Sequence, residues 1–308
     1  MPSWGQVLTD IELTRNPLDS MRRKYLRTMY KYTKRNIIAY YSAFIQKPNI
    51  NGCGIDENDK NAFMQAVYGL DKSKGLDLIL HTPGGGIAPT ESLVIYLQKM
   101  FGKDIRVFVP QIAMSAGTMI ALSAKEIVLG KQSNLGPIDP QYGGMSCAGI
   151  LEEFQQARKE VKENPSSAAI WGLIISKYHP TFIGDCKKAI EWSEEMVKTW
   201  LINNMFSEYN EEEGNKLAQK VVTELSSHNK TYSHSRHIHS DLLKKLNLKI
   251  VDLEELDDKK IDGCKDLQDC VLTLHHSYMH TLAKTATIKI VENHKGEAMI
   301  IAGKGTGK

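Results

Sequence analysis

The chain has 308 residues, of which 42% are hydrophobic and 24% charged, and its formal net charge is +3. This composition is ordinary for a globular protein with a sizeable core, and the small net charge of interspersed sign excludes a nucleic-acid-binding footprint. No apolar run reaches the roughly 18 residues of a membrane-spanning helix, and residues 1–20 lack the apolar core of a signal peptide. We therefore expect a soluble cytoplasmic protein with no integral membrane segment.

The cysteine content also favours a cytoplasmic location. There are 5 of them, an odd number, and no Cys-x-x-Cys motif occurs. Free thiols in a reducing environment are therefore expected.

Helical and β-rich segments alternate over the first half of the chain. Their order is a helix at 18–34, a strand at 36–44, a helix at 56–70, a strand at 76–82, a helix at 89–101, a strand at 105–111, a helix at 115–124 and a strand at 126–129. Strands alternating with helical patterns predict βαβ units on a parallel sheet.

The second half is mainly helical in its pattern. We expect helices at 150–162, 168–178, 181–204 and 211–225, a polar histidine-rich loop at 226–240, a helix at 241–246, a strand at 248–253, a helix at 262–286 and a hairpin of 287–292 with 298–301. No internal repeat or linker composition divides the chain. We predict one domain at 35–302 between an N-terminal helical arm at 1–34, which could equally cap its own domain, and a flexible tail at 303–308.

Two motifs of small residues follow consecutive predicted strands. Gly84, Gly85 and Gly86 come directly after the strand at 76–82, and Ser115 follows the strand at 105–111. Glycines after a strand allow backbone N–H groups to point at a developing negative charge, and a serine at a helix start can be exposed to a substrate. The two motifs together predict an oxyanion hole and a nucleophile, although a plain turn and a packed small residue would also explain them.

The ordered set of motifs resembles the serine dehydrogenase proteinase family, a branch of the ClpP and signal peptide peptidase A class of serine peptidases. The resemblance rests on Pro83-Gly84-Gly85, on Met114-Ser115-Ala116-Gly117 and on Leu135-Gly136-Pro137-Ile138-Asp139-Pro140-Gln141. It implies an α/β fold of ClpP/crotonase-like stacked βαβ units with a helical C-terminal elaboration. It also implies a serine endopeptidase that uses no cofactor and no metal.

The resemblance gives each motif residue a role. Ser115 would attack the carbonyl of a peptide substrate, the N–H groups of Gly85 and Ala116 would hold the oxyanion, and Gly84 and Gly86 would contact the substrate. Relatives assemble into rings or stacked oligomers, so a homo-oligomer enclosing its sites is expected.

The general base needs a separate argument. ClpP has its triad histidine in the stretch that corresponds to 136–140, where this chain has Asp139, a plausible turn residue before proline. Relatives among the signal peptide peptidases use a lysine, and Lys177 follows the apolar run 170–176. Burial in that run would let the amine act in its neutral form, whereas a helix-end cation is the other interpretation. If Lys177 is not the base, Asp139 or a loop histidine such as His234 returns to consideration.

Other functions remain open at this point. A crotonase-type acyl-CoA enzyme shares the fold and the oxyanion hole but not a serine nucleophile, and a catalytically idle oligomeric scaffold would share the fold alone. His276 and His280 lie four residues apart on a predicted helix, but Ser277 replaces the glutamate of a His-Glu-x-x-His site, so no metal is expected. The terminal Gly-Lys-Gly-Thr-Gly-Lys has no following helix and is not a phosphate loop.

Overall fold

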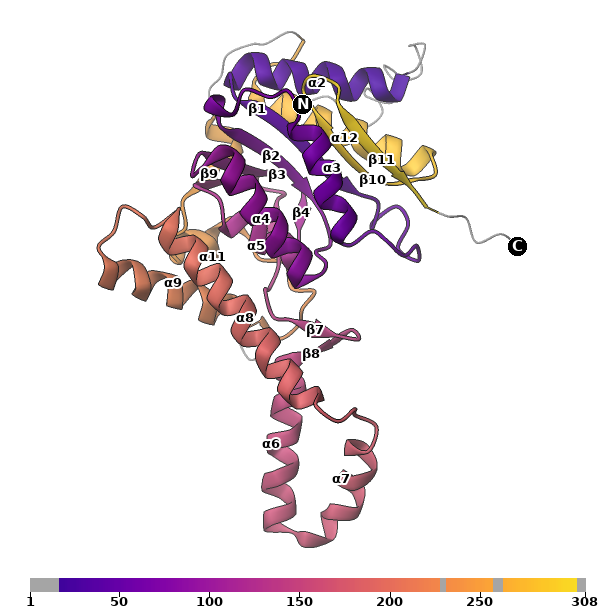
Figure 1. Cartoon of the computed structure of the whole chain (residues 1–308), viewed down its shortest axis with the longest axis vertical. Helices are drawn as coiled ribbons and strands as arrows, with labels where there is room; N and C mark the ends of the chain where they lie inside the picture. The colour runs from indigo at the N-terminus through magenta and orange to yellow at the C-terminus, as the bar shows by residue number, and fades with distance from the viewer. Residues whose placement is uncertain (1–16, 228–230, 257–262, 304–308) are drawn as a thin grey trace.

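The computed structural model describes residues 17–227, 231–256 and 263–303 and is built on one seven-stranded sheet (Figure 1). The strand order is β11-β10-β1-β2-β3-β5-β9. Strands β1, β2, β3, β5 and β9 run parallel, and β10 and β11 add an antiparallel edge beside β1. The predicted α/β class is therefore confirmed, with the C-terminal hairpin joined to the sheet. The bounds are β1 Asn36–Ser42, β2 Leu76–His81, β3 Ile105–Val109, β5 Glu126–Leu129, β9 Ile250–Asp252, β10 Thr287–Asn293 and β11 Ala298–Ala302.

Helices cover both faces of the sheet (Figure 1). On β1, Ile38 and Tyr40 belong to one buried cluster, and Ile37, Ala39 and Tyr41 belong to the other. A parallel strand that is buried on both faces is apolar along most of its length, as β1 is between its two polar ends, Asn36 and Ser42. The first cluster includes side chains of α3 Glu57–Val67, α4 Ile87–Phe101 and α5 Ala116–Leu122, and the second includes side chains of α2 Pro17–Thr33 and α12 Leu267–Lys284.

The N-terminal helix α2 packs on its own chain. Leu26 and Met29 are fully buried, and α2 lies along α12. The guanidinium of Arg22, also fully buried, lies 3.0 Å from the carboxylate of Glu292 on β10. The described part of 1–34 is thus a layer of the core. Residues 1–16 of the predicted arm and 304–308 of the predicted tail lie outside the described residues.

Two short strand pairs were not predicted because each strand is only two residues long. Strand β4 Ile112–Ala113 pairs in parallel with β6 Asn134–Leu135, and β7 Gln141–Tyr142 pairs with β8 Met145–Ser146. Thr82 forms a parallel bridge with Ala113. This bridge brings the loop after β2 beside the turn after β4, where Ser115 lies.

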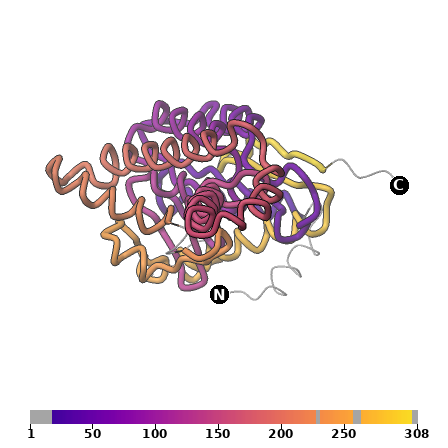
Figure 2. Tube along the Cα trace, turned by 90° about the horizontal axis from the view of Figure 1, so that it is seen from below, coloured from indigo at the N-terminus to yellow at the C-terminus, as the bar shows by residue number. Residues whose placement is uncertain are grey.

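A helical hairpin projects from the body below the sheet (Figure 1). It consists of α6 Cys147–Glu163, the 3-10 turn η2 Pro165–Ser167 and α7 Ala168–Ile175, and the long helix α8 Phe182–Asn203 returns to the body. Viewed from below in Figure 2, α6 and α7 come toward the reader. The other described elements are η1 Lys72–Lys74, α9 Glu211–Ser226, α11 Ser240–Lys245 and η3 Leu253–Glu255. Of the described helices, none has the length and apolar character needed to cross a membrane.

Candidate active site

Ser115 lies on a sharp turn between β4 and α5. Its backbone angles are φ 52° and ψ −117°, and its side chain makes no capping hydrogen bond to α5. A positive φ is uncommon for a residue other than glycine and indicates local strain. A serine on a strained strand-to-helix turn presents its hydroxyl outward, as the nucleophile elbow of α/β-hydrolases does.

Close contacts around Ser115 explain the neighbouring glycines. Gly84 has φ 102°, and a Cβ there would lie 2.7 Å from Cβ of Ser115. A Cβ on Gly117 would lie 2.5 Å from Cγ2 of Thr82. The two loops therefore approach too closely for any side chain at these positions.

A strap at Ile55 fixes the glycine loop. The N–H of Ile55 donates to the carbonyl of Gly84 at 2.8 Å, and the N–H of Gly86 donates to the carbonyl of Ile55 at 3.0 Å. Between them, the N–H of Gly85 donates to no acceptor in the described part of the chain, and neither does that of Ala116, the first residue of α5. Two such amides beside a serine can stabilise an oxyanion.

These residues open onto a cavity of about 740 Å³. Ser115, Gly85, Gly86 and Ala116 all line it, whereas Gly84 lies behind Ser115 and is not part of the lining. Most of the remaining lining is apolar and comes from α4, α5, α8 and the segment after β6: Ile87, Ala88, Pro89, Met119, Ile138, Pro140, Ala189 and Trp192. A largely apolar wall would exclude water from a reaction at Ser115.

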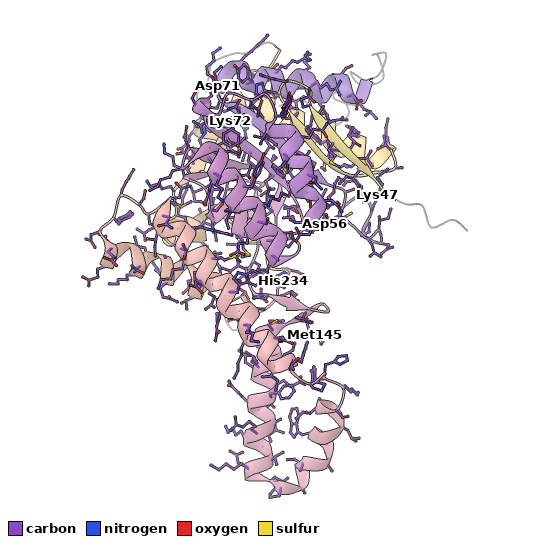
Figure 3. All side chains as sticks on the ribbon, viewed as in Figure 1. Lys47, Asp56, Asp71, Lys72, Met145 and His234 are labelled. Atoms are coloured by element: carbon purple, nitrogen blue, oxygen red, sulfur yellow. The ribbon has the colours of Figure 1, made fainter. Side chains whose placement is uncertain are left out.

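A histidine–aspartate pair reaches the same cavity. Nδ1 of His234 lies 2.7 Å from Oδ1 of the buried Asp139, and Oδ2 of Asp139 accepts a hydrogen bond from Nε2 of Gln141 at 3.0 Å. His234 and Ser115 line one cavity. Figure 3 shows His234 where the body meets the base of the projecting hairpin. The carboxylate is thus held on both oxygens and can orient the imidazole.

Backbone contacts bring the three segments together. Leu135 of β6 and Ile238, four residues after His234, exchange two hydrogen bonds of 2.9 and 3.0 Å. The hydroxyl of Thr118 on α5 donates to the carbonyl of Ala113 at 3.0 Å and accepts from the N–H of Gly136 at 2.9 Å. The segment that carries Asp139 is therefore tied to the Ser115 turn and to the His234 loop.

Lys177 does not line the cavity that contains Ser115. Its side chain is exposed just beyond α7 and lines a second cavity, of about 290 Å³, with Tyr142, Tyr178 and Phe182. Lys177 is thus exposed and not buried, whereas a lysine base was expected to be buried. It lines a different cavity from Ser115, although Tyr142 and Asp185 line both.

None of the cysteines lines the Ser115 cavity, and neither His276 nor His280 lines it. All five cysteines are free, as predicted. Burial raises the pKa of Cys147 to about 12, with further contributions from Cys186 and Asp139, so this thiol stays protonated. His276 and His280 lie on α12, and the described residues contain no group of three metal-ligating side chains.

Comparison with known proteins identifies the family. Residues 7–259 match the profile of the ClpP-like SDH-type serine proteinases, which is most of the chain and includes Ser115, Asp139 and His234. The chain belongs to this family. It is 29% identical over 192 residues to Uncharacterized protein MJ1495 of Methanocaldococcus jannaschii, covering 62% of this chain and 57% of that protein. It is 31% identical over 166 residues to Uncharacterized protein MJ0137 of the same organism, covering 54% and 51%. The chain thus spans about half the length of these relatives.

Proposed function

We propose that this ClpP-like proteinase is a serine endopeptidase in which Ser115 is the nucleophile, His234 the general base and Asp139 the residue that orients His234. The observation that carries the proposal is that the hydrogen-bonded His234–Asp139 pair and Ser115 line one cavity. The order of the three along the chain is Ser, Asp, His, which is also the order in α/β-hydrolases.

The chemistry follows from the roles of these groups. Oγ of Ser115 would form a bond to the peptide carbonyl carbon while its proton passes to Nε2 of His234, because Nδ1 faces Asp139. The negative charge on the carbonyl oxygen would be stabilised by the N–H groups of Gly85 and Ala116. The C–N bond then breaks, His234 gives its proton to the leaving amine, and water releases the acyl group from Ser115 by the same steps.

The dyad of Ser115 with Lys177 is the second candidate mechanism. It requires the exposed amine of Lys177 to reach a cavity other than the one that it lines. An acyl-CoA enzyme or an idle scaffold would use neither base. As finer parts of the proposal, we retain the ClpP/crotonase-like stacking of the βαβ units, the homo-oligomer and the cytoplasmic location.

The decisive experiment is labelling with a fluorophosphonate probe, read out by intact mass. The wild type should gain one probe adduct, and Ser115→Ala should gain none while keeping its circular dichroism spectrum. His234→Gln should label far more slowly than the wild type, and Lys177→Arg should label at the wild-type rate. Labelling of Ser115→Ala, or no labelling of the wild type, would exclude the serine peptidase. A thermal shift of the wild type with coenzyme A would favour the acyl-CoA enzyme.

A further inference from the structure

The second helix of the projecting hairpin, α7, is apolar and exposed. Helix α7 has the sequence AAIWGLII, with no charged residue and no buried residue. Ile170 is 65% exposed and Leu173 is 72% exposed, the former next to the exposed Ala169. Ala169, Ile170 and Leu173 share one face because residues three and four apart on a helix are neighbours. We call this face the apolar tip.

The opposite side of α7 is held by α6, so the outward direction of the apolar tip is fixed. Nε1 of Trp171 donates to Oε2 of Glu160 on α6 at 2.8 Å, and Trp171 and Ile174 are half-buried. The indole N–H is therefore already satisfied. The apolar face is exposed because the other side of α7 packs against α6, and not because α7 is detached from the hairpin.

Exposed cationic side chains lie on the segments that precede and follow α7. Arg158, Lys159 and Lys162 are exposed on the neighbouring α6, and Lys177 is exposed just beyond the end of α7. Glu163 is the exposed acidic residue among the described residues 158–177, since Glu160 is half-buried and bonded to Trp171. The exposed side chains of the hairpin segment 158–177 thus carry an excess of positive charge.

We propose that the apolar tip binds the surface of a membrane that contains anionic lipids. Apolar side chains in the middle and lysines around them are the pattern of a helix that lies in the headgroup region, where cations meet lipid phosphates. This inference concerns binding and goes beyond the proposed peptidase activity.

A second copy of the chain fits the same surface less well. An eight-residue helix is about 12 Å long, so two such faces would bury much less than the roughly 1,200 Å² of a stable pair. Symmetric pairing of α7 with α7 would also place the same cations opposite each other. A membrane has neither problem, because it supplies an extended surface of opposite charge.

Helix α8 connects the projecting hairpin to the Ser115 cavity. Figure 1 and Figure 2 show the hairpin projecting away from the sheet, with α8 running from its base into the body. Asp185, Lys188 and Trp192 of α8 line the Ser115 cavity. Helix α8 therefore links the hairpin, where the membrane would bind, to the wall of the Ser115 cavity.

The test is flotation of the whole protein with vesicles. Wild-type protein should float with vesicles of equal parts phosphatidylcholine and phosphatidylserine, and much less with phosphatidylcholine alone. The double variant Ile170→Asp with Leu173→Asp should bind at least ten-fold more weakly. Tyr68→Asp is the matched control, since Tyr68 is 78% exposed on the body and its loss should leave binding unchanged.

A second pair of substitutions tests the charge. Lys159→Gln and Lys162→Gln should each weaken binding about five-fold, and added salt should weaken wild-type binding in the same direction. Far-ultraviolet circular dichroism checks that every variant is folded. Absence of flotation by the wild type, or equal flotation by the tip variant, would overturn the proposal. A smaller particle mass of the tip variant in light scattering, without any change in flotation, would assign the apolar tip to self-association instead.

Discussion

Nδ1 of His234 lies 2.7 Å from Oδ1 of Asp139, although 95 residues separate the two in the chain. Asp139 is fully buried, and its second oxygen is also hydrogen-bonded. Such a carboxylate fixes the imidazole so that Nε2 faces away from it, and it stabilises the imidazolium that forms when the serine gives up its proton. His234 can therefore serve as a base toward the cavity that contains Ser115.

The first prediction concerns this pair. His234→Gln removes the base and should lower kcat/KM for a peptide substrate by about 10²–10⁴, the usual contribution of general-base catalysis. Asp139→Asn should cause a loss of similar size, because the amide can hold the wrong tautomer of the imidazole. His237→Gln is the matched control, since His237 is exposed in the same loop and does not line the cavity. A His234→Gln protein as active as the control would remove His234 from the mechanism.

The second prediction separates the two candidate bases. Lys177→Ala and Lys177→Arg should both keep turnover within a few-fold of wild type, because Lys177 lines a different cavity from Ser115. A lysine base would give a different pattern, since arginine stays protonated and both substitutions would then remove most activity. Measuring both variants beside His234→Gln decides between the mechanisms.

The order of elements was predictable from local patterns. Helix α3 and strands β1, β2, β3 and β5 were predicted correctly to within a few residues, because apolar runs and helical periodicity are local signals. The glycines near Ser115 indicated a turn there, and the structure explains them, since a Cβ on Gly84 would lie 2.7 Å from Cβ of Ser115 and one on Gly117 would lie 2.5 Å from Cγ2 of Thr82. The features that the sequence did not reveal depend on pairing between segments that are distant in the chain.

The His234–Asp139 contact is the main example. It relies on the bridge between Leu135 and Ile238 and on two-residue strands, neither of which leaves a periodic pattern in the sequence. His234 was visible as one of several histidines in a polar loop, and only its position beside Asp139 sets it apart. The apolar sequence before Lys177 was interpreted as burial, but the described structure shows it as an exposed face of α7 at the end of a hairpin.

The third prediction concerns the oxyanion loop. In Gly85→Ala the new Cβ would lie 2.2 Å from N of Ile55, so the loop must shift and move the N–H of residue 85. Loss of one oxyanion donor typically lowers kcat by about 10²–10³. Gly184→Ala is the control, because a Cβ at this position on α8 meets no atom within 4 Å. Steady-state kinetics on both variants makes the test, and unchanged kcat in Gly85→Ala would mean that the loop only shapes the turn.

The fourth prediction concerns the support beneath that loop. Nζ of the buried Lys289 donates to the carbonyl of Gly54 at 2.8 Å and to the carboxylates of Asp56 and Asp59 at 2.9 Å each. Gly54 precedes Ile55, whose backbone holds the glycine loop. Lys289→Met leaves the carboxylate of Asp59 buried without its cation, so the free energy of unfolding should fall by about 3–5 kcal/mol.

Lys289→Met should also lower kcat more than it raises KM, because the strap would release the oxyanion loop while the rest of the cavity stays in place. Lys295→Met is the control, since Lys295 is exposed on the turn after β10 and its loss should leave stability and kcat close to wild type. Urea unfolding and kinetics measure the two effects separately. If kcat stays at the wild-type value in a destabilised Lys289→Met, the network supports the fold and not the site.

The fifth prediction concerns acid stability. His81 ends β2, fully buried between the rings of Phe44 and Tyr41 at 4.9 and 5.5 Å, and burial lowers its pKa to about 3. In the unfolded chain a histidine has a pKa of about 6.5. The unfolded state therefore binds a proton over this interval and the folded state does not, so stability is full above about pH 6.5 and falls as the pH drops toward 3.

Each unit of pH below about 6.5 should cost up to about 1.4 kcal/mol for this one group. Burial also lowers the pKa of His275 and of His294, the latter to about 4, so the total slope is steeper than one group gives. Urea unfolding between pH 7 and pH 5 measures that slope for the wild type and for His81→Phe. The variant should lose stability less steeply on acidification than the wild type, whatever its stability at pH 7. His237→Gln, which removes an exposed histidine, should keep the wild-type slope. If the free energy of unfolding of His81→Phe and of the wild type changed with pH at the same rate, His81 would be protonated as readily in the folded chain as in the unfolded one.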